Sequence, residues 1–251
     1  MIAMRADAGR GWGWIVEGWR LFAKSPVIWV MIMLIYMSII VTLSFFPYVG
    51  RLVNALLIPV LVGGMLYGAA TQANGGKLQV LHLFRGFQDQ DRTGPLLLLG
   101  AIGIGGYLLM GLVILLFMGG TLATGMMMDS TGMAVTPQTL VNLLAGAGLV
   151  ALLVVLILVF LVAAAWFYGV PLVMLAGQNA WPAVQDSLVA GWSNILPLLV
   201  FGLISLILML LALIPLGLGF LIWGPVMICA TYASYREVFE RPATPSIKLS
   251  K

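Results

Sequence analysis

The side chains that could carry chemistry are few and far apart in this chain. His82 is the only histidine and Cys229 the only cysteine, so a zinc site of nitrogen and sulfur ligands has too few donors. Bis-histidine haem ligation is excluded for the same reason. Asp89 and Asp91 flank a loop beside Arg92, which indicates a solvated turn and not an acid–base pair. We therefore expect no catalytic residue, no metal ligand and no cofactor.

Two further patterns could bind ligands, and each has a simpler explanation. Met126, Met127, Met128 and Met133 could offer thioether sulfurs to Cu(I). However, methionine is abundant, with 15 residues, and three in a row cannot all face one ion on a regular helix. The glycine-rich stretch 100–105 follows no strand, so it does not form a dinucleotide fingerprint.

The composition is that of a membrane protein. Hydrophobic residues make up 62% of the chain, charged residues 8%, and the mean hydropathy is +1.12. Soluble domains carry about 25% charged residues. All twenty Asp, Glu, Lys and Arg residues lie outside or at the ends of the long apolar runs, which argues against pumps and ion-coupled transporters. We expect an all-α, polytopic membrane helical bundle.

Hydropathy predicts about six transmembrane helices. A crossing needs about twenty apolar residues, and six runs supply them: 27–47, 51–72, 95–119, 141–175, 196–214 and 217–236. The fourth run is too long for one ordinary crossing, so it must tilt, project, or break near Pro171, where a re-entrant piece is an alternative. Residues 1–251 then form a single integral membrane domain, with a cytoplasmic or interfacial segment 1–26 and a tail 237–251.

The basic residues predict the orientation of this bundle. With six spans, eleven of the twelve lysines and arginines lie on one side and only Arg51 lies opposite. Positive residues are retained in the cytoplasm. We expect both termini to be cytoplasmic.

Three short amphipathic segments, 14–22, 80–87 and 183–192, each precede a pair of spans. Aromatic residues beside basic ones are typical of helices in the headgroup layer. The simpler interpretation is anchoring; the alternative is recognition of anionic lipid or of a cytoplasmic partner. The expected interfacial anchors are Trp12, Trp14, Trp19, Arg20, Phe84, Arg85, Phe87 and Trp192.

The same segments suggest a threefold internal repeat. Each contains a glycine followed by an aromatic residue, and the second span of each pair contains a proline before aliphatic residues. These prolines are Pro59, Pro171 and Pro225.

Small residues predict helix packing. Gly64 and Gly68 are four residues apart, as are Ala101 and Gly105. Small residues at this spacing let helix backbones approach closely in lipid. The contacts could lie within the bundle or against a partner.

Several glycine, proline and aromatic motifs near the start of the chain resemble those of a known family. They are Gly11-Trp12-Gly13-Trp14, Gly18-Trp19-Arg20-Leu21-Phe22, Pro26, Pro47, Gly50, Pro59, Gly63-Gly64 and Leu83-Phe84-Arg85-Gly86-Phe87. The chain resembles a family of uncharacterised proteobacterial inner-membrane proteins named after a Burkholderia locus. The resemblance covers about the first ninety residues, and the rest by topology. It implies a bacterial inner membrane and a six-helix bundle, with no assigned activity.

We expect a non-enzymatic accessory or scaffold subunit, whose partners are bilayer lipids and a membrane protein or a second copy, and not nucleic acid. The alternative is a carrier or binder of an apolar ligand such as a lipid or quinone. A third class, an enzyme acting on lipid headgroups, would need convergent polar groups that the sequence does not provide.

The orientation can be tested with a reporter that is active only in the periplasm. Fused after Lys251, it should give no signal, because the positive-inside distribution keeps that end in the cytoplasm. A fusion at Arg51 provides the positive control. A strong signal from Lys251 would overturn the six-span topology.

Overall fold

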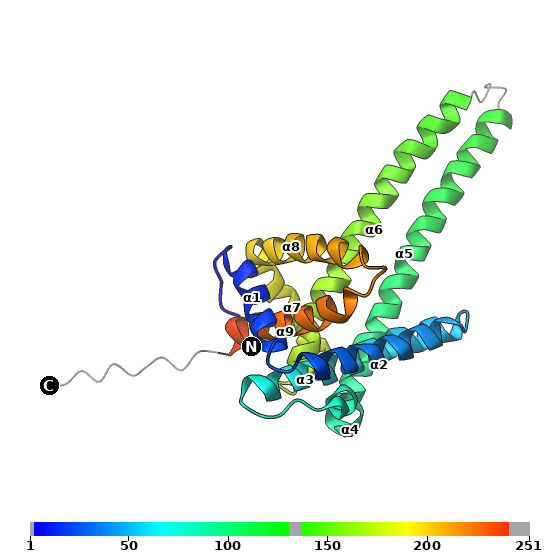
Figure 1. The fold of residues 1–251 in the computed structure, drawn as a ribbon. Helices are drawn as coiled ribbons and strands as arrows, with labels where there is room; N and C mark the ends of the chain where they lie inside the picture. Colours follow the sequence, from blue (N-terminus) through cyan, green and yellow to red (C-terminus); the bar gives the residue numbers. More distant parts are fainter. Residues whose placement is uncertain (1–2, 131–136, 241–251) are drawn as a thin grey trace. The chain divides into compact units, whose positions relative to one another are not determined.

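The computed structural model describes residues 3–130 and 137–240, with side chains between 118 and 147 described only at positions 119, 120, 123, 141 and 146. Within these residues the chain forms nine α-helices and one 3-10 helix, and no strand (Figure 1). The all-α class is confirmed for this part of the chain. The elements are α1 Arg10–Phe22, α2 Pro26–Ser44, α3 Val49–Ala73, η1 Val80–Phe84, α4 Arg85–Gln88, α5 Gln90–Ser130, α6 Pro137–Met174, α7 Ala180–Ser193, α8 Ile195–Leu213 and α9 Phe220–Phe239.

Proline and glycine mark several helix ends. Pro26 opens α2, where the missing N–H would have no partner in any case. Gly75 follows α3 with φ 85°, and Gly177 follows α6 with φ 74°. Only glycine adopts this left-handed region readily, so both turns leave the helix sharply.

Among the described residues, five helices are long and apolar enough to cross a membrane: Pro26–Ser44, Val49–Ala73, Gln90–Phe117, Gly148–Met174 and Ile195–Leu213. The sixth predicted span, 217–236, corresponds to α9, which is not among them. Its second half carries Thr231, Ser234, Arg236 and Glu237. These residues lower its hydropathy.

The fourth predicted span does not break. α6 remains helical through Pro171 and ends at Met174, with Pro171 inside the helix. A proline removes one backbone hydrogen bond, yet membrane helices tolerate it where neighbouring groups compensate. Of the alternatives for this run, the re-entrant piece is therefore not seen.

The contacts divide the described chain into two compact units. The first combines the residues up to Gly100 with those from Ala164 onward. At its centre lies α9, which contacts α1, α2, α3 and α8 (Figure 1). Its largest fully buried side chains include Trp14, Trp29 and Tyr235.

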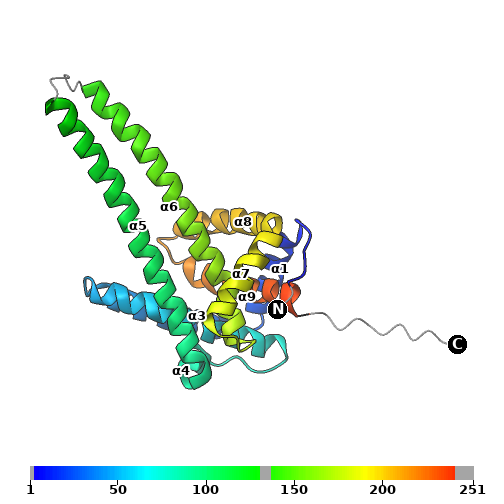
Figure 2. The ribbon, with the colours of Figure 1, turned by 180° about the vertical axis from the view of Figure 1, so that it is seen from behind.

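The second unit, Ala101–Ala163, consists of the adjoining parts of α5 and α6, which run antiparallel (Figure 2). The helices approach each other at Gly106, where an added Cβ would lie 2.6 Å from Val162 Cγ2. Most described side chains are exposed, among them Leu108 and Leu115. This hairpin has little core of its own, and its apolar surface suits lipid or another protein.

Short helices occupy all three predicted amphipathic segments, and each packs on a long helix. A Cβ at Gly18 of α1 would lie 2.7 Å from Val226 O of α9. A Cβ at Gly86 of α4 would lie 2.5 Å from Val60 O of α3. In α7, the Ser187 hydroxyl donates to Ala164 O of α6 at 2.6 Å.

The two predicted small-residue pairs differ in their surroundings. A Cβ at Gly64 would overlap the backbone of η1, 2.5 Å from His82 O, and one at Gly68 would lie 2.9 Å from Leu78 Cδ1. At Gly105 a Cβ would meet no atom within 4 Å, and Ala101 is exposed. The second pair therefore lines no close contact in the described structure, because spacing defines a face without deciding what covers it.

The Gly64→Ala substitution should destabilise the protein, since its methyl group must displace the backbone of η1. Overpacking of this kind costs about 1–3 kcal/mol. The matched control, Gly105→Ala, adds the same methyl group to open space and should leave stability unchanged or slightly raised. Thermal unfolding of both variants in detergent compares them. Equal melting temperatures would contradict the close contact at Gly64.

Candidate functional site

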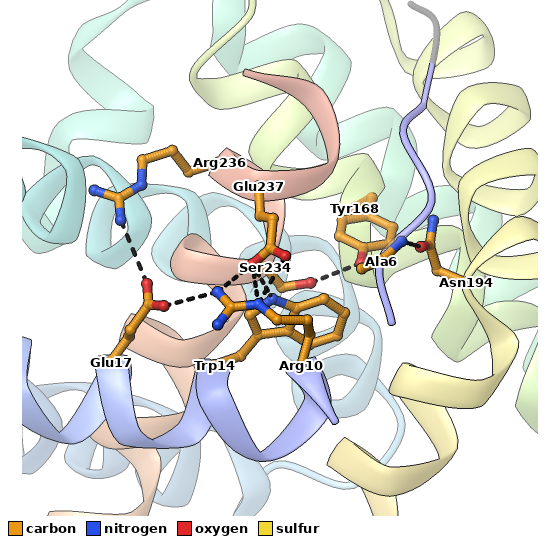
Figure 3. Close-up of polar contacts among 9 residues, drawn as sticks. All are labelled: Ala6, Arg10, Trp14, Glu17, Tyr168, Asn194, Ser234, Arg236 and Glu237. Carbon is orange, nitrogen blue, oxygen red and sulfur yellow. Dashed lines mark hydrogen bonds and ion pairs between the residues drawn. The ribbon is translucent and has the colours of Figure 1, made fainter. Parts of the chain in front are cut away.

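A network of charged side chains joins α1 to α9 (Figure 3). Arg10 Nε donates to both carboxylate oxygens of Glu237 at 2.8 and 2.9 Å, and Arg10 Nη2 donates to Glu17 at 2.8 Å. Arg236 Nη2 lies 3.4 Å from the other Glu17 oxygen. Two cations and two anions thus alternate across the contact and neutralise one another.

The spacing of residues in α1 explains how this helix presents the network. Arg10, Trp14 and Glu17 are separated by four and then three residues, so they share one face. Trp14 is fully buried, and its indole Nε1 donates to Glu237 Oε2 at 2.9 Å. A buried indole N–H needs such an acceptor. The same carboxylate therefore serves Trp14 and Arg10.

Uncharged polar groups extend the cluster (Figure 3). The hydroxyls of Tyr168 and Ser234 share a hydrogen bond of 2.7 Å, and both residues are fully buried. The buried side chain of Asn194 accepts from Ala6 N at 2.7 Å and donates to Met4 O at 3.0 Å. These bonds hold residues 4–6 against the junction of α7 and α8. Because the groups satisfy one another, we assign them a structural role.

The ion pairs change the ionisation of their members. Glu237 lies one residue beyond the predicted span 217–236. Burial alone would raise the pKa of Glu237, but hydrogen bonds from Arg10 and Trp14 outweigh it, and the pKa lies below the ordinary 4.5. The hydrogen bonds to Glu237 and Glu17 raise the pKa of Arg10. The pair is therefore charged at neutral pH.

Beside this network a pocket of about 150 Å³ opens between α1, α3 and α9. Arg20, Lys24 and Arg236 supply positive charge to its wall, and Glu17 supplies one negative charge. In the part of the chain that the structure describes, the side chains of Arg20 and Lys24 make no hydrogen bond or ion pair. The remaining lining residues are Leu21, Ala73, Cys229, Tyr232 and Ala233.

Most of the expected interfacial anchors are exposed. Trp12, Trp19 and Trp192 expose 55%, 52% and 77% of their surface, and Phe87 exposes 41%. Arg20 is exposed as well. Large aromatic side chains in water are unfavourable, so these positions suit a headgroup layer.

Three expected anchors have other surroundings. Trp14 is an exception to the anchoring hypothesis, because the packing of α1 on α9 buries it completely. Arg85 lies over the ring of Tyr67, 5.2 Å from its centroid, and is half-buried like its neighbour Phe84.

Several polar contacts were not predicted from the sequence. The partnership of Arg10 with Glu237 joins residues 227 positions apart, which no local pattern reveals. Arg92, interpreted as part of a solvated turn, donates to Val173 O at 2.8 Å and to Met174 O at 3.0 Å, and so caps α6. The spacing of Arg10, Trp14 and Glu17 in the sequence could have predicted that they share a polar face of α1.

The residues considered for metal binding lie apart. His82 Nδ1 accepts from Gln79 N at 3.3 Å, and burial, followed by the charge of Arg85, lowers the pKa of His82. Cys229 is buried at the pocket. Over the described residues, no three His, Cys, Asp or Glu side chains form a group that could hold a metal ion. The methionines at 126–128 and 133 lie outside the described side chains.

Comparison with protein-family models, with curated proteins and with solved structures found no match for this chain. The resemblance drawn from the sequence motifs therefore stays a prediction.

The Glu237→Gln substitution should lower stability at neutral pH, because it removes a charge that Arg10 and Trp14 bind. We expect the free energy of unfolding to fall by about 1–2 kcal/mol, a modest loss because solvent screens the partly exposed ion pair. The lowered pKa of Glu237 stabilises the wild-type protein above pH 4.5, and this stabilisation is lost as the pH falls through the native pKa. Melting temperatures measured against pH test both statements.

The melting temperature of the Glu237→Gln variant should therefore fall less on acidification than that of the wild-type protein. Asp91→Asn, at an exposed carboxylate, is the control and should keep the wild-type profile. If Glu237→Gln and the wild-type protein lose stability equally on acidification, the ion pair does not stabilise the fold.

Proposed function

We propose that the protein is a non-enzymatic integral membrane protein that acts as an accessory or scaffold subunit, assembling with a second copy or with a larger membrane complex. This proposal rests on the exposed apolar surface of the second unit, Ala101–Ala163. Its described side chains, including Tyr107, Leu116, Leu149 and Ile157, are apolar and mostly exposed. Lipid or a neighbouring protein must cover them.

The length of these helices favours a protein neighbour over lipid alone. α5 has 41 residues and α6 has 38. At 1.5 Å per residue each reaches about 60 Å, whereas the hydrocarbon core is about 30 Å thick. Part of the hairpin therefore extends beyond the bilayer, and the sequence there is rich in glycine and alanine, at 119–125 and 145–148. Such residues allow close approach of another helix.

The six-span topology belongs to the same proposal, with the part of α9 up to residue 236 in the sixth crossing. α9 is surrounded by α1, α2, α3 and α8, and eleven of its twenty residues are buried. A helix inside a bundle needs no lipid-compatible surface, which accounts for its lower hydropathy. We place both termini in the cytoplasm on the distribution of basic residues, and we place the protein in a bacterial inner membrane on the resemblance of its first ninety residues.

The contacts of the short helices support a threefold internal repeat. Gly18 packs on Val226 and Gly86 packs on Val60, and each valine directly follows a proline. In the third copy, the short helix α7 packs on the long helix α6, through the hydrogen bond from Ser187 to Ala164. The proline, Pro171, lies seven residues away, so the third contact has shifted along its helix.

The alternative function, a carrier of an apolar lipid or quinone, would require a large apolar cavity. Ligand pockets of this kind have volumes of about 300–1,000 Å³. The pocket beside α1 has a volume of about 150 Å³, which is half the lower limit of this range, and charged side chains line its wall. It does not favour that function.

A photo-crosslinking amino acid placed at Ala123 or Val141 tests the scaffold proposal. Both positions are exposed on the hairpin. Irradiation of intact membranes should give a discrete protein adduct from each, identified by mass spectrometry as a second copy or another membrane protein. The matched control at Leu203, 62% exposed on α8, should react with lipid.

Two results together would contradict the proposal. The hairpin positions would give no protein adduct, and the protein extracted in mild detergent would have the mass of a single chain. The apolar-ligand carrier would then become the stronger hypothesis.

A further inference from the structure

We infer that the pocket between α1, α3 and α9 binds the phosphate group of an anionic phospholipid. Arg20 and Lys24, with Arg236, supply the positive charge. This inference is independent of the scaffold function, because it concerns the first unit alone.

The charges of the pocket do not balance. Glu17 is the one carboxylate among the described residues that line it, and that group already accepts hydrogen bonds from Arg10 and from Arg236. Figure 3 shows Glu17 between these two guanidinium groups. Arg20 and Lys24 have no such partner among the described residues, so two positive charges are available to an anion. Arginine and lysine retain their charges at neutral pH.

The depth of the pocket matches the position of lipid phosphates. Lys24 lies two residues before α2 begins at Pro26, and Ala73 is the last residue of α3. Both helices are candidate spans, so their ends lie at the boundary between hydrocarbon and water. Phospholipid headgroups occupy that layer.

The size and lining of the pocket suit a headgroup. The volume of about 150 Å³ is well above the roughly 10–15 Å³ that a cavity needs to hold one water, so the pocket can admit a group of several heavy atoms such as a phosphate. Leu21, Ala73 and Ala233 provide apolar contacts, and the hydroxyl of Tyr232 can donate to a phosphate oxygen.

The surface of α2 offers a path for an acyl chain. Val27, Met31 and Leu34 are exposed and follow the spacing of one helix face, starting three residues after Lys24. A lipid held by its phosphate could lay its tail along these side chains, which free phosphate cannot do.

Native mass spectrometry of the full-length protein in detergent tests the inference, with phosphatidylglycerol as the probe and diacylglycerol as its phosphate-free counterpart. The wild-type protein should retain phosphatidylglycerol more tightly than diacylglycerol. The double variant Arg20→Gln, Lys24→Gln should weaken phosphatidylglycerol binding at least about tenfold, because two charge-assisted contacts are lost. The control Arg5→Gln, Lys77→Gln removes the same charge at exposed positions outside the pocket, and should bind as the wild-type protein does.

A second variant, Ala73→Phe, fills the pocket from α3 and keeps every charge. It should also weaken phosphatidylglycerol binding, which separates loss of the site from a general loss of charge. Inorganic phosphate added in excess should leave the lipid bound. Displacement by phosphate would assign the site to a soluble anion and overturn the lipid assignment. Wild-type lipid retention in both pocket variants, or an equal loss in the charge control, would refute the site itself.

Discussion

The contact between α1 and α9 joins the two ends of the described chain, and the rest of the first unit depends on it. Gly18 allows the backbones to meet, since any side chain there would overlap Val226 and Ala230. Close approach in turn brings Arg10 within hydrogen-bonding distance of Glu237. In a membrane, packing and polar contacts must hold helices together, because lipid is as apolar as their side chains.

The same contact determines where charge is free. An ion near hydrocarbon is costly unless it is paired. Arg10, Glu17, Arg236 and Glu237 satisfy this condition among themselves. Arg20 of α1 and Lys24, two residues after this helix, have side chains outside the network and line the pocket at the ends of α2 and α3. Positive charge available for recognition therefore lies next to charge that serves the structure.

The helix positions were largely predictable because hydropathy and helix-end residues act locally. Pro26 and the apolar run after it define α2 without reference to any other element. The short helices followed from their amphipathic pattern in the same way. The surroundings of single residues were less predictable, because a distant neighbour decides them: α1 buries Trp14 in its contact with α9, and no described residue packs on Gly105. A residue type shows what a position can tolerate, and not what lies opposite.

The sequence by itself determined the all-α class, the long apolar helices that could cross a membrane and the restriction of charge to their ends, because these depend on the local run of apolar and charged residues. Only the tertiary structure decided which small residues meet a backbone, which tryptophans are exposed, and that Glu17 pairs with Arg10 while the Arg20 side chain pairs with no described residue. These outcomes depend on contacts between residues far apart in the chain, and no pattern within one segment contains them.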